Sequence, residues 1–339
     1  MLTRKLIGNA HYINLLMVRV TTGCTARCLM CNFWRGKRTS LSWAHLQKII
    51  DDATGLGIKQ VCFTGGEPMT YRHLWAGIKY LTKKGLVYSL ITNGSCLTRK
   101  NVAKLMSSPP TRIYISIDSP DNSVHDLLRG KRGIWNSAAQ GVLLLNEYDK
   151  RPKIIINYVI SNKNFKEIQD LVALSQQFPF DELNLLQIKG LPRLALTKKQ
   201  IRFYNKDVVP LLAAALNKHN IKLSSSNPYV FGEKPRDIAA SSKGQYSMYN
   251  YKRIPCCVCE RMLFIETTGE VYPCNNTPYM GGVFSLGNVF QDKLSKIVVS
   301  PRASFVRREL CGGQLCVTCD PINLATNQNA VLSDRGDIT

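Results

Sequence analysis

The sequence predicts an α/β fold, a partial (β/α)6 TIM-like barrel followed by a small C-terminal domain built from a β-hairpin and a helix. Six short apolar runs alternate with helical patterns through the first 190 residues, and this order is typical of parallel strands joined by right-handed crossovers. Candidate binding motifs follow the first four runs, where barrels of this kind carry their active-site loops. Most cysteines gather in two clumps, one after the first run and one after residue 255.

The predicted strands and helices are separated by caps and breakers. Ser40 or Ser42 can cap the first helix, Gly85 ends the second, and Pro109-Pro110 breaks the third. The expected strands cover residues 14–20, 58–63, 86–91, 112–117, 153–160 and 182–188. The expected helices cover about residues 42–54, 71–84, 98–107, 134–149, 164–178 and 197–218.

The chain divides into four expected segments. Residues 1–190 form the barrel, and residues 191–255 form a helical connector with a loop rich in Ser, Pro and Gly. That loop either covers the mouth of the active site or acts as a linker. Residues 256–320 form the small cysteine-bearing domain, with a hairpin over residues 262–274, and residues 321–339 form a flexible tail.

Composition narrows the class of protein. The chain of 339 residues is 45% hydrophobic, which suits a globular protein with a sizeable core. It has no apolar run of about 18 residues and no apolar signal-peptide core at its start. Its 12 cysteines favour metal sites in a reducing cytoplasm over a disulfide scaffold.

The formal net charge of +22 is compatible with an acidic peptide or a phosphorylated substrate. The basic residues are scattered, without a Lys/Arg-rich run of about 5–8 residues interleaved with aromatics. A solvated basic surface is therefore the preferred interpretation, and nucleic-acid binding is not expected.

The first cysteine array is C-x3-C-x2-C, formed by Cys24, Cys28 and Cys31 directly after the first strand. Thiolates hold [4Fe–4S] clusters, usually four at a time. Three of them can bind three irons and leave the fourth iron open for a reacting ligand. On spacing alone, a zinc site with a distant fourth ligand and an ordinary trio of reduced thiols both stay open.

A second motif, Gly65-Gly66-Glu67-Pro68, follows the second predicted strand. Glycines allow a close approach of the backbone, and the Glu67 carboxylate can accept hydrogen bonds from an amino group. Together, the array and this motif resemble the radical S-adenosylmethionine (SAM) superfamily over most of the chain. The resemblance implies a [4Fe–4S] cluster on the three cysteines, with SAM bound at the open iron and Gly65 to Pro68 lining its methionine part.

The same resemblance suggests further SAM contacts. Asn93, Ser116 and Asp118 would contact the ribose or the carboxylate, and Arg129 would contact the carboxylate. The family usually has an aromatic residue before the last cluster cysteine, packed near the adenine. Here that position is Met30, so Phe33 or Trp34 could take over this contact.

The second clump resembles the auxiliary-cluster extensions called SPASM and twitch domains. Cys259, Gly269 and Cys274 match C-x9-G-x4-C, and a C-x2-C pair follows at Cys316 and Cys319. A full two-cluster SPASM domain needs more cysteines, so the shorter twitch form with one auxiliary [4Fe–4S] cluster is expected on these four. A zinc ribbon is the alternative from spacing alone.

Three cysteines are left over, namely Cys256, Cys257 and Cys311. Cys256-x2-Cys259-x14-Cys274 is also similar to the three-cysteine auxiliary site of the molybdenum-cofactor cyclase. One of the leftover thiols could instead give a hydrogen atom to a substrate radical. A buried thiol without chemistry is the plain alternative.

The resemblance implies a chemistry and several partners. A flavodoxin- or ferredoxin-type reductant would supply an electron, SAM would split to a 5′-deoxyadenosyl radical, and a substrate C–H would lose its hydrogen. We expect oxidation, cross-linking or epimerisation of a natural product, with a ribosomal peptide as first choice and an aminosugar-type molecule as second. The alternatives are a cyclase-like enzyme on a nucleotide and a basic RNA-binding protein with structural zinc.

Overall fold

A single sheet organises the chain in the computed structural model, which describes residues 13–188, 190–225, 227–244, 256–280 and 282–311. Within these residues the sheet has ten strands in the order β10-β9-β8-β1-β2-β3-β4-β5-β6-β7. The six central strands are parallel, as predicted. They are β1 (Leu15–Thr21), β2 (Gln60–Gly65), β3 (Val87–Thr92), β4 (Arg112–Ser116), β5 (Lys153–Ile160) and β6 (Glu182–Gln187).

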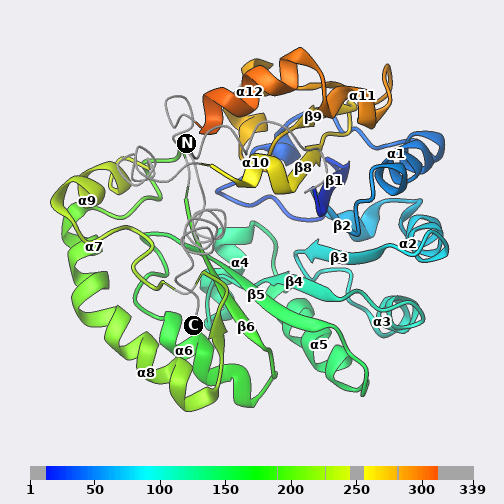
Figure 1. Cartoon of the computed structure of the whole chain (residues 1–339). Helices are drawn as coiled ribbons and strands as arrows, with labels where there is room; N and C mark the ends of the chain where they lie inside the picture. Colours follow the sequence, from blue (N-terminus) through cyan, green and yellow to red (C-terminus); the bar gives the residue numbers. More distant parts are fainter. Residues whose placement is uncertain (1–12, 189, 226, 245–255, 281, 312–339) are drawn as a thin grey trace, which may run out of the picture.

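Helices cover the outer side of this curved sheet (Figure 1). A Cβ atom on Gly77 would meet Phe63 of β2 and Leu46 of the first helix, so Phe63 faces the helices. Side chains alternate along a strand, and the neighbouring Cys62 therefore faces the barrel interior. The main covering helices are α1 (Trp43–Gly55), α2 (Leu74–Lys83), α3 (Arg99–Met106), α5 (Ile134–Asn146), α6 (Ile168–Ala173) and α8 (Val209–His219).

Two helical predictions differ in detail from the structure. The helix expected over 164–178 is the shorter α6, followed by the 3-10 turn η5 (Leu174–Gln176). The helix expected over 197–218 is present as one continuous helical stretch, but α7 (Lys198–Phe203) and α8 are joined by the π-helical η6 (Tyr204–Val208). Pro210 lies in the first turn of α8, directly after the π-helical segment. Its missing N–H interrupts the regular hydrogen-bond pattern at this point of the helix.

The C-terminal part joins the barrel sheet. The predicted hairpin is confirmed as β8 (Met262–Ile265) and β9 (Glu270–Tyr272), which pair antiparallel. β8 also pairs parallel with β1, so the hairpin extends the sheet beyond its first strand. The other elements here are α10 (Val258–Arg261), η7 (Thr277–Met280), η8 (Gly282–Phe284), β10 (Gly287–Asn288), α11 (Leu294–Val298) and α12 (Pro301–Cys311).

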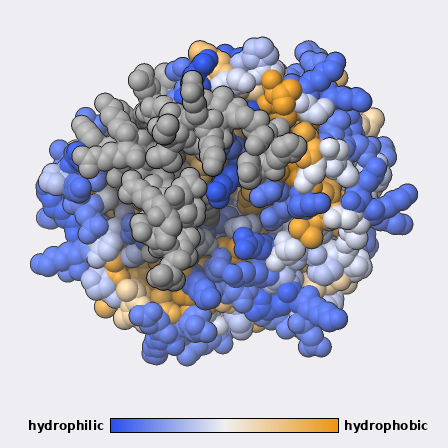
Figure 2. All heavy atoms as spheres, in the orientation of Figure 1, coloured by the Kyte–Doolittle hydropathy of each residue, from blue (hydrophilic) through white to orange (hydrophobic). Residues whose placement is uncertain are grey.

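Two small elements complete the connector, β7 (Lys222–Leu223), which pairs parallel with β6, and α9 (Pro235–Ser241). Hydrophilic residues cover much of the molecular face that Figure 2 shows outside its grey part. None of the described helices combines the length and the apolar character needed to span a bilayer.

The turn after β3 depends on a glycine. Gly94 has a φ of +81°, and a Cβ atom there would lie 2.6 Å from the Cβ atom of Ala138 in α5. Gly85 has a similar φ of +72° but nothing within 4 Å of its Cβ position. A comparison of alanine substitutions at the two glycines therefore distinguishes two energetic costs, that of the left-handed backbone angle and that of the steric clash with Ala138.

We expect Gly94→Ala to lower the free energy of unfolding by about 3 kcal/mol, since it adds a clash to the left-handed backbone. Gly85→Ala should cost only about 1 kcal/mol. Chemical denaturation of both variants measures the difference. Adding Ala138→Gly to Gly94→Ala should recover part of the loss, and equal effects of the two glycine variants would contradict the clash.

Candidate functional site

The three N-terminal cysteines lie on the loop between β1 and the 3-10 turn η3 (Phe33–Arg35). Cys28 is buried, Cys24 and Cys31 are half-buried, and all three are free thiols. They are close enough for Cys31 to influence the pKa values of the other two. Burial is the main cause that raises the pKa of Cys24 and of Cys28, so these thiols need a metal or donors to ionise.

Donors to the sulfurs are present. The Ala26 amide donates to Cys24 Sγ at 3.4 Å, and Asn93 Nδ2 donates to the same sulfur at 3.6 Å. The positive charge of the Arg129 guanidinium opposes the rise in the pKa of Cys28. Such donors stabilise thiolates and tune clusters bound to them. The three residues therefore fit the cluster that the sequence predicts.

A site for one metal ion would look different. Among the residues that the structure describes, no three Cys, His, Asp or Glu side chains come together as the ligands of a single ion would. A [4Fe–4S] cluster does not need its cysteine sulfurs to meet at one point, because each cysteine binds a different iron.

The glycines of the second motif fit the loop after β2 against the cysteine loop. The Gly66 amide donates to the Thr21 carbonyl and the Glu67 amide to the Gly23 carbonyl, both at 2.8 Å. A Cβ atom on Gly66 would overlap the Gly23 carbonyl, and one on Gly65 would overlap the Thr21 carbonyl. The close approach predicted for these glycines is therefore made to the cysteine loop, and their contact with SAM stays a prediction.

The Glu67 carboxylate is fully buried and connects two segments, the loop after β2 and the turn after β3. Oε1 accepts from Thr92 Oγ1 at 2.8 Å and from the Met69 amide at 3.1 Å, and Oε2 accepts from the Asn93 amide at 2.7 Å. Burial raises the pKa of Glu67, and these donors partly offset the rise. Pro68, buried beside it, opens the 3-10 turn η4 (Pro68–Thr70).

Asp118 and Arg129 form a buried ion pair after β4. Arg129 Nε lies 2.6 Å from Asp118 Oδ2, and Arg129 Nη2 donates to Oδ1 at 2.8 Å. Burial alone would lower the pKa of Arg129, but the attraction of Asp118 raises it well above its usual value. The SAM contacts predicted for Ser116, Asp118 and Arg129 remain predictions. The structure adds that Asp118 and Arg129 already bind each other and that Ser116, at the end of β4, is 8% exposed.

The helix that carries Arg129 was not predicted. It is α4 (Asn122–Arg129), capped by Asp121, whose carboxylate accepts from the amides of Ser123 and Val124. The Pro-Asp pair before it was the available sign of a helix start, but the helix is too short to show a clear apolar period. Its end docks on the cysteine loop, since the Arg27 amide donates to the Arg129 carbonyl at 3.0 Å.

His125, to which the sequence assigned no role, lies inside this arrangement. Its Nδ1 accepts from the Asp118 amide at 2.9 Å. Burial, and then the charge of Arg129, lowers the pKa of His125 to about 3. The imidazole is therefore neutral at physiological pH and serves as an acceptor that positions the loop after β4.

A second buried cation, Arg19 of β1, connects the cysteine loop to the C-terminal hairpin. It pairs with Glu266 after β8 and donates to the Tyr279 hydroxyl at 2.9 Å. Its guanidinium lies 4.0 Å from the centre of the Phe33 ring. Sequence reasoning missed this residue, although an arginine inside an apolar strand was a visible sign of a buried partner.

The residues proposed to replace the missing aromatic adenine contact occupy different places. Met30 packs against the group formed by Ala26, Cys28 and Ile134. Phe33 stacks on Arg19, and Trp34 Nε1 donates to the Cys28 carbonyl at 3.1 Å. The structure therefore gives Phe33 and Trp34 contacts within the protein, and the adenine contact stays a prediction.

The second cysteine group lies at the other end of β1. Cys259 in α10 precedes β8, and Cys274 follows β9, so both lie near the amino end of β1. Cys259 and Cys274 are buried, whereas Cys256 and Cys257 are half-buried. Cys311 is the last residue of α12, and Cys316 and Cys319 lie outside the described residues. The ligand set predicted for the auxiliary cluster, and the roles predicted for Cys256, Cys257 and Cys311, remain predictions.

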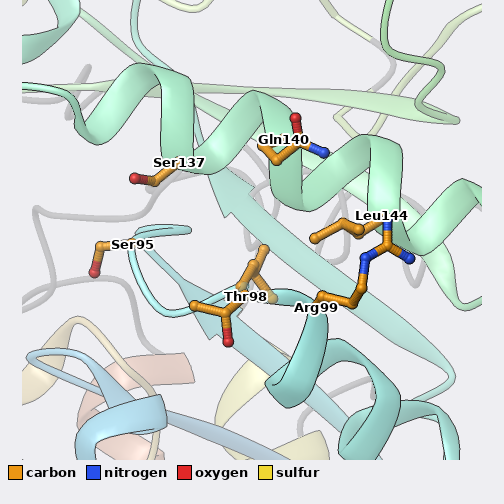
Figure 3. Close-up of a pocket in the computed structure, with 7 residues that line it drawn as sticks. Ser95, Thr98, Arg99, Ser137, Gln140 and Leu144 are labelled. Atoms are coloured by element: carbon orange, nitrogen blue, oxygen red, sulfur yellow. The ribbon is translucent and has the colours of Figure 1, made fainter.

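A cavity of about 340 Å³ lies between α5 and the segment after β3 (Figure 3). Ser137 and Gln140 of α5 line one side, and Ser95 and Thr98 line the other. Ser95 also shares a hydrogen bond of 2.6 Å with Thr25 in the cysteine loop. None of the residues predicted to contact SAM lines this cavity, so it is separate from that site.

These features fit an iron–sulfur protein with a parallel barrel, whose cysteine loop follows the first strand. Residues 18–175 match the sequence model of the Radical SAM superfamily, and residues 256–320 match that of an iron–sulfur cluster-binding domain, SPASM. The chain belongs to the radical SAM superfamily and carries a SPASM domain. These domains imply a SAM-binding [4Fe–4S] cluster, SAM itself and an auxiliary iron–sulfur cluster.

Named relatives agree with this assignment. An AdoMet-dependent heme synthase of Methanosarcina barkeri is 30% identical over 178 residues, 51% of this chain and 50% of the relative. The chain therefore matches only about half the length of such relatives. The antilisterial bacteriocin subtilosin biosynthesis protein AlbA of Bacillus subtilis is 24% identical over 291 residues, 83% of this chain and 58% of AlbA.

A solved structure confirms the predicted fold class. Native anSMEcpe with bound AdoMet and Kp18Cys peptide superposes with a TM-score of 0.66 at 15% identity, covering 95% of this chain and 99% of that one.

We expect Cys28→Ala to remove about four irons per chain, because three thiolates hold the SAM-binding cluster, and to abolish formation of 5′-deoxyadenosine. Iron analysis and chromatography of the anaerobic protein measure both effects. Cys62→Ala is the matched control, since Cys62 is a buried thiol of β2 outside the cysteine loop. Unchanged iron content in Cys28→Ala would contradict the assignment.

We expect His125→Asn to flatten the pH dependence of stability between about pH 6 and pH 4. The folded protein keeps His125 neutral, with a pKa of about 3, whereas the unfolded chain takes up a proton near pH 6.5. The wild type therefore loses up to about 1.4 kcal/mol of unfolding free energy per pH unit through this residue as the pH falls. Urea titrations at several pH values measure the slope, and an equal slope in the variant would refute a neutral His125.

Proposed function

We propose that this protein is a radical SAM enzyme that modifies a peptide at an unactivated C–H bond. The bound cluster and SAM supply the chemistry, namely one-electron cleavage of SAM to a 5′-deoxyadenosyl radical that takes a hydrogen atom from the substrate. The chain's own residues hold the cluster loop, orient the substrate and keep water away. A flavodoxin- or ferredoxin-type protein is the proposed electron donor, in the reducing cytoplasm that the many free cysteines favour.

The observation that carries the proposal is the placement of the two cysteine groups along β1. The cluster loop follows the carboxyl end of β1, while Cys259 and Cys274 lie near its amino end, on the hairpin that pairs with it. A strand of seven residues spans about 20 Å at about 3.3 Å per residue. The barrel interior between these ends is therefore the place where a substrate would lie near both iron–sulfur sites.

Relatives support a peptide as the substrate. AlbA, which matches 83% of this chain, is a bacteriocin biosynthesis protein, and the structure that covers 95% of this chain holds a peptide. The heme synthase relative matches only 51% of the chain and bears less on the substrate. The basic net charge of +22 mildly favours an acidic peptide.

Several residues would keep the cluster loop in place during the reaction. Glu67 ties the loops after β2 and β3 together, and the amide of Asn93 is one of its partners. Asn93 also reaches Cys24, so a single residue connects this brace to a cluster ligand. Arg19 ties the loop to the hairpin through Phe33 and Glu266. These contacts position the site without contacting the reacting atoms.

The fate of the substrate radical depends on the second cysteine group. We propose oxidation or cross-linking. Cys259, Cys274, Cys316 and Cys319 would hold the auxiliary cluster, which would supply an acceptor for the second electron of the substrate. Epimerisation is the other outcome, in which a thiol of Cys256, Cys257 or Cys311 gives a hydrogen atom back to the substrate carbon.

The test is an anaerobic assay with reconstituted protein, SAM, dithionite and a library of acidic and neutral peptides. We expect a subset of peptides to raise formation of 5′-deoxyadenosine at least tenfold and to lose two mass units. Mass spectrometry of the peptide and chromatography of the nucleoside measure the result. Cys24→Ala is the inactive control, because it removes a cluster ligand.

The same assay in deuterated water separates the outcomes. Deuterium at the altered carbon without a loss of two mass units would favour epimerisation, and Cys→Ala at the leftover positions would then identify the donor. Stimulation by a porphyrin or an aminosugar and by no peptide would refute the peptide proposal.

A further inference from the structure

A row of three buried polar residues crosses neighbouring strands of the barrel. Ser116 of β4 is in register with Asn157 of β5, and Asn157 is in register with Asn184 of β6. Their exposed fractions are 8%, 7% and 3%. Buried asparagines are uncommon, and no role in the SAM site was predicted for Asn157 or Asn184.

The row faces the barrel interior. Tyr158, the neighbour of Asn157 on β5, points to the covering helices, since its hydroxyl donates to the Asn164 carbonyl at 2.7 Å and the ring lies near Tyr204 of η6. Because successive strand side chains face opposite sides, Asn157 points inward. Asn184 does so as well, because its Nδ2 donates to Asn157 Oδ1 at 2.7 Å.

One polar atom of this pair is unsatisfied. Asn184 Oδ1 is buried and has no hydrogen-bond partner among the described residues. An acceptor left without a donor in a protein interior is costly, so a group that brings an N–H to this oxygen would be bound favourably. The Nδ2 group of the same Asn184 carboxamide already donates to Asn157, and this hydrogen bond fixes the orientation of the Asn184 side chain.

The row lies where a substrate is expected. Ser116 is two residues before Asp118, whose carboxylate accepts from the Val159 amide at 2.9 Å just beyond Asn157 on β5. The pair is therefore level with Ser116, itself one of the predicted SAM contacts, and a few residues before the carboxyl ends of β5 and β6. Neighbouring strands are about 4.8 Å apart, so the row spans about 10 Å and can meet two or three residues of an extended chain.

We infer that the Asn157–Asn184 pair is a substrate-recognition site in which Asn184 Oδ1 accepts a hydrogen bond from a neutral amide N–H, such as a peptide bond. The neutral class follows from the row itself, since Ser116, Asn157 and Asn184 carry no charge to compensate a buried ammonium group. The inference rests on the proposed peptide substrate and assigns Asn184 as the residue that hydrogen-bonds the backbone of that peptide.

The first test is independent of substrate identity. The holoenzyme, with its asparagine side chains labelled with 15N and its clusters oxidised, is titrated with N-methylacetamide, which mimics a peptide bond, and with methyl acetate, which lacks the N–H. We expect saturable shifts of the Asn184 amide signal with the amide only, at millimolar concentration. No saturable shift, or equal binding of the ester, would overturn the inference even if the enzyme modifies peptides.

The second test compares two asparagines of similar chemistry. Asn205 in η6 also has a buried Oδ1 without a partner among the described residues, and its Nδ2 donates to the Gly232 carbonyl at 2.9 Å. It belongs to the outer helical layer, so Asn205→Leu is a matched control for Asn184→Leu.

With a peptide that stimulates the wild type, we expect Asn184→Leu to raise KM about tenfold, the usual effect of one lost hydrogen bond, and Asn205→Leu to leave it unchanged. Asn184→Leu removes one unsatisfied acceptor but also the donor to Asn157 Oδ1, so we expect these two effects to offset each other and the melting temperature to change little. A lower melting temperature with an unchanged KM would show a structural role and overturn the inference.

Discussion

The structure depends on a backbone contact that only glycine permits. The loop that carries the cysteines and the loop that carries Glu67 share two amide–carbonyl hydrogen bonds of 2.8 Å, and neither could form with a side chain at Gly65 or Gly66. Once these loops meet, Glu67 is enclosed and its carboxylate fixes the turn after β3. Three segments, namely the cysteine loop, the loop after β2 and the turn after β3, are thereby held at one edge of the sheet before any cofactor binds.

Charge burial extends this arrangement to the next strand. The Asp118–Arg129 pair is shielded from water, and each partner also acts on a neighbouring part of the site. The charge of Arg129 opposes the rise in the pKa of Cys28, and Asp118 accepts a hydrogen bond from the backbone of β5. An isolated charge in such a place would be strongly unfavourable. The pair therefore acts as a unit, and α4 is the element that brings its two halves together.

Many features of the fold and the site could be predicted from local sequence, whereas those that depend on distant residues could not. The strands, the hairpin and the positions of the motifs follow from apolar runs and turn residues. The π-helical segment inside the long helix was not predicted, although Pro210 was a sign of a local break in its hydrogen-bond pattern. By contrast, Arg19 and Glu266 are 247 residues apart, and nothing near either names its partner. The pairing of β8 with β1 is equally non-local, and α4 is only eight residues long, too short for a clear period.

The parallel pairing of β8 with β1 has a consequence for the integrity of the molecule. An open barrel has two bare edges, and a bare edge strand is a template for another chain. Here the hairpin pairs with the edge of β1, so the cysteine-bearing C-terminal region also protects that edge of the barrel from pairing with another chain. A fragment that ended before this hairpin would expose the backbone groups of β1 and would tend to aggregate, even though its own helices and strands were complete.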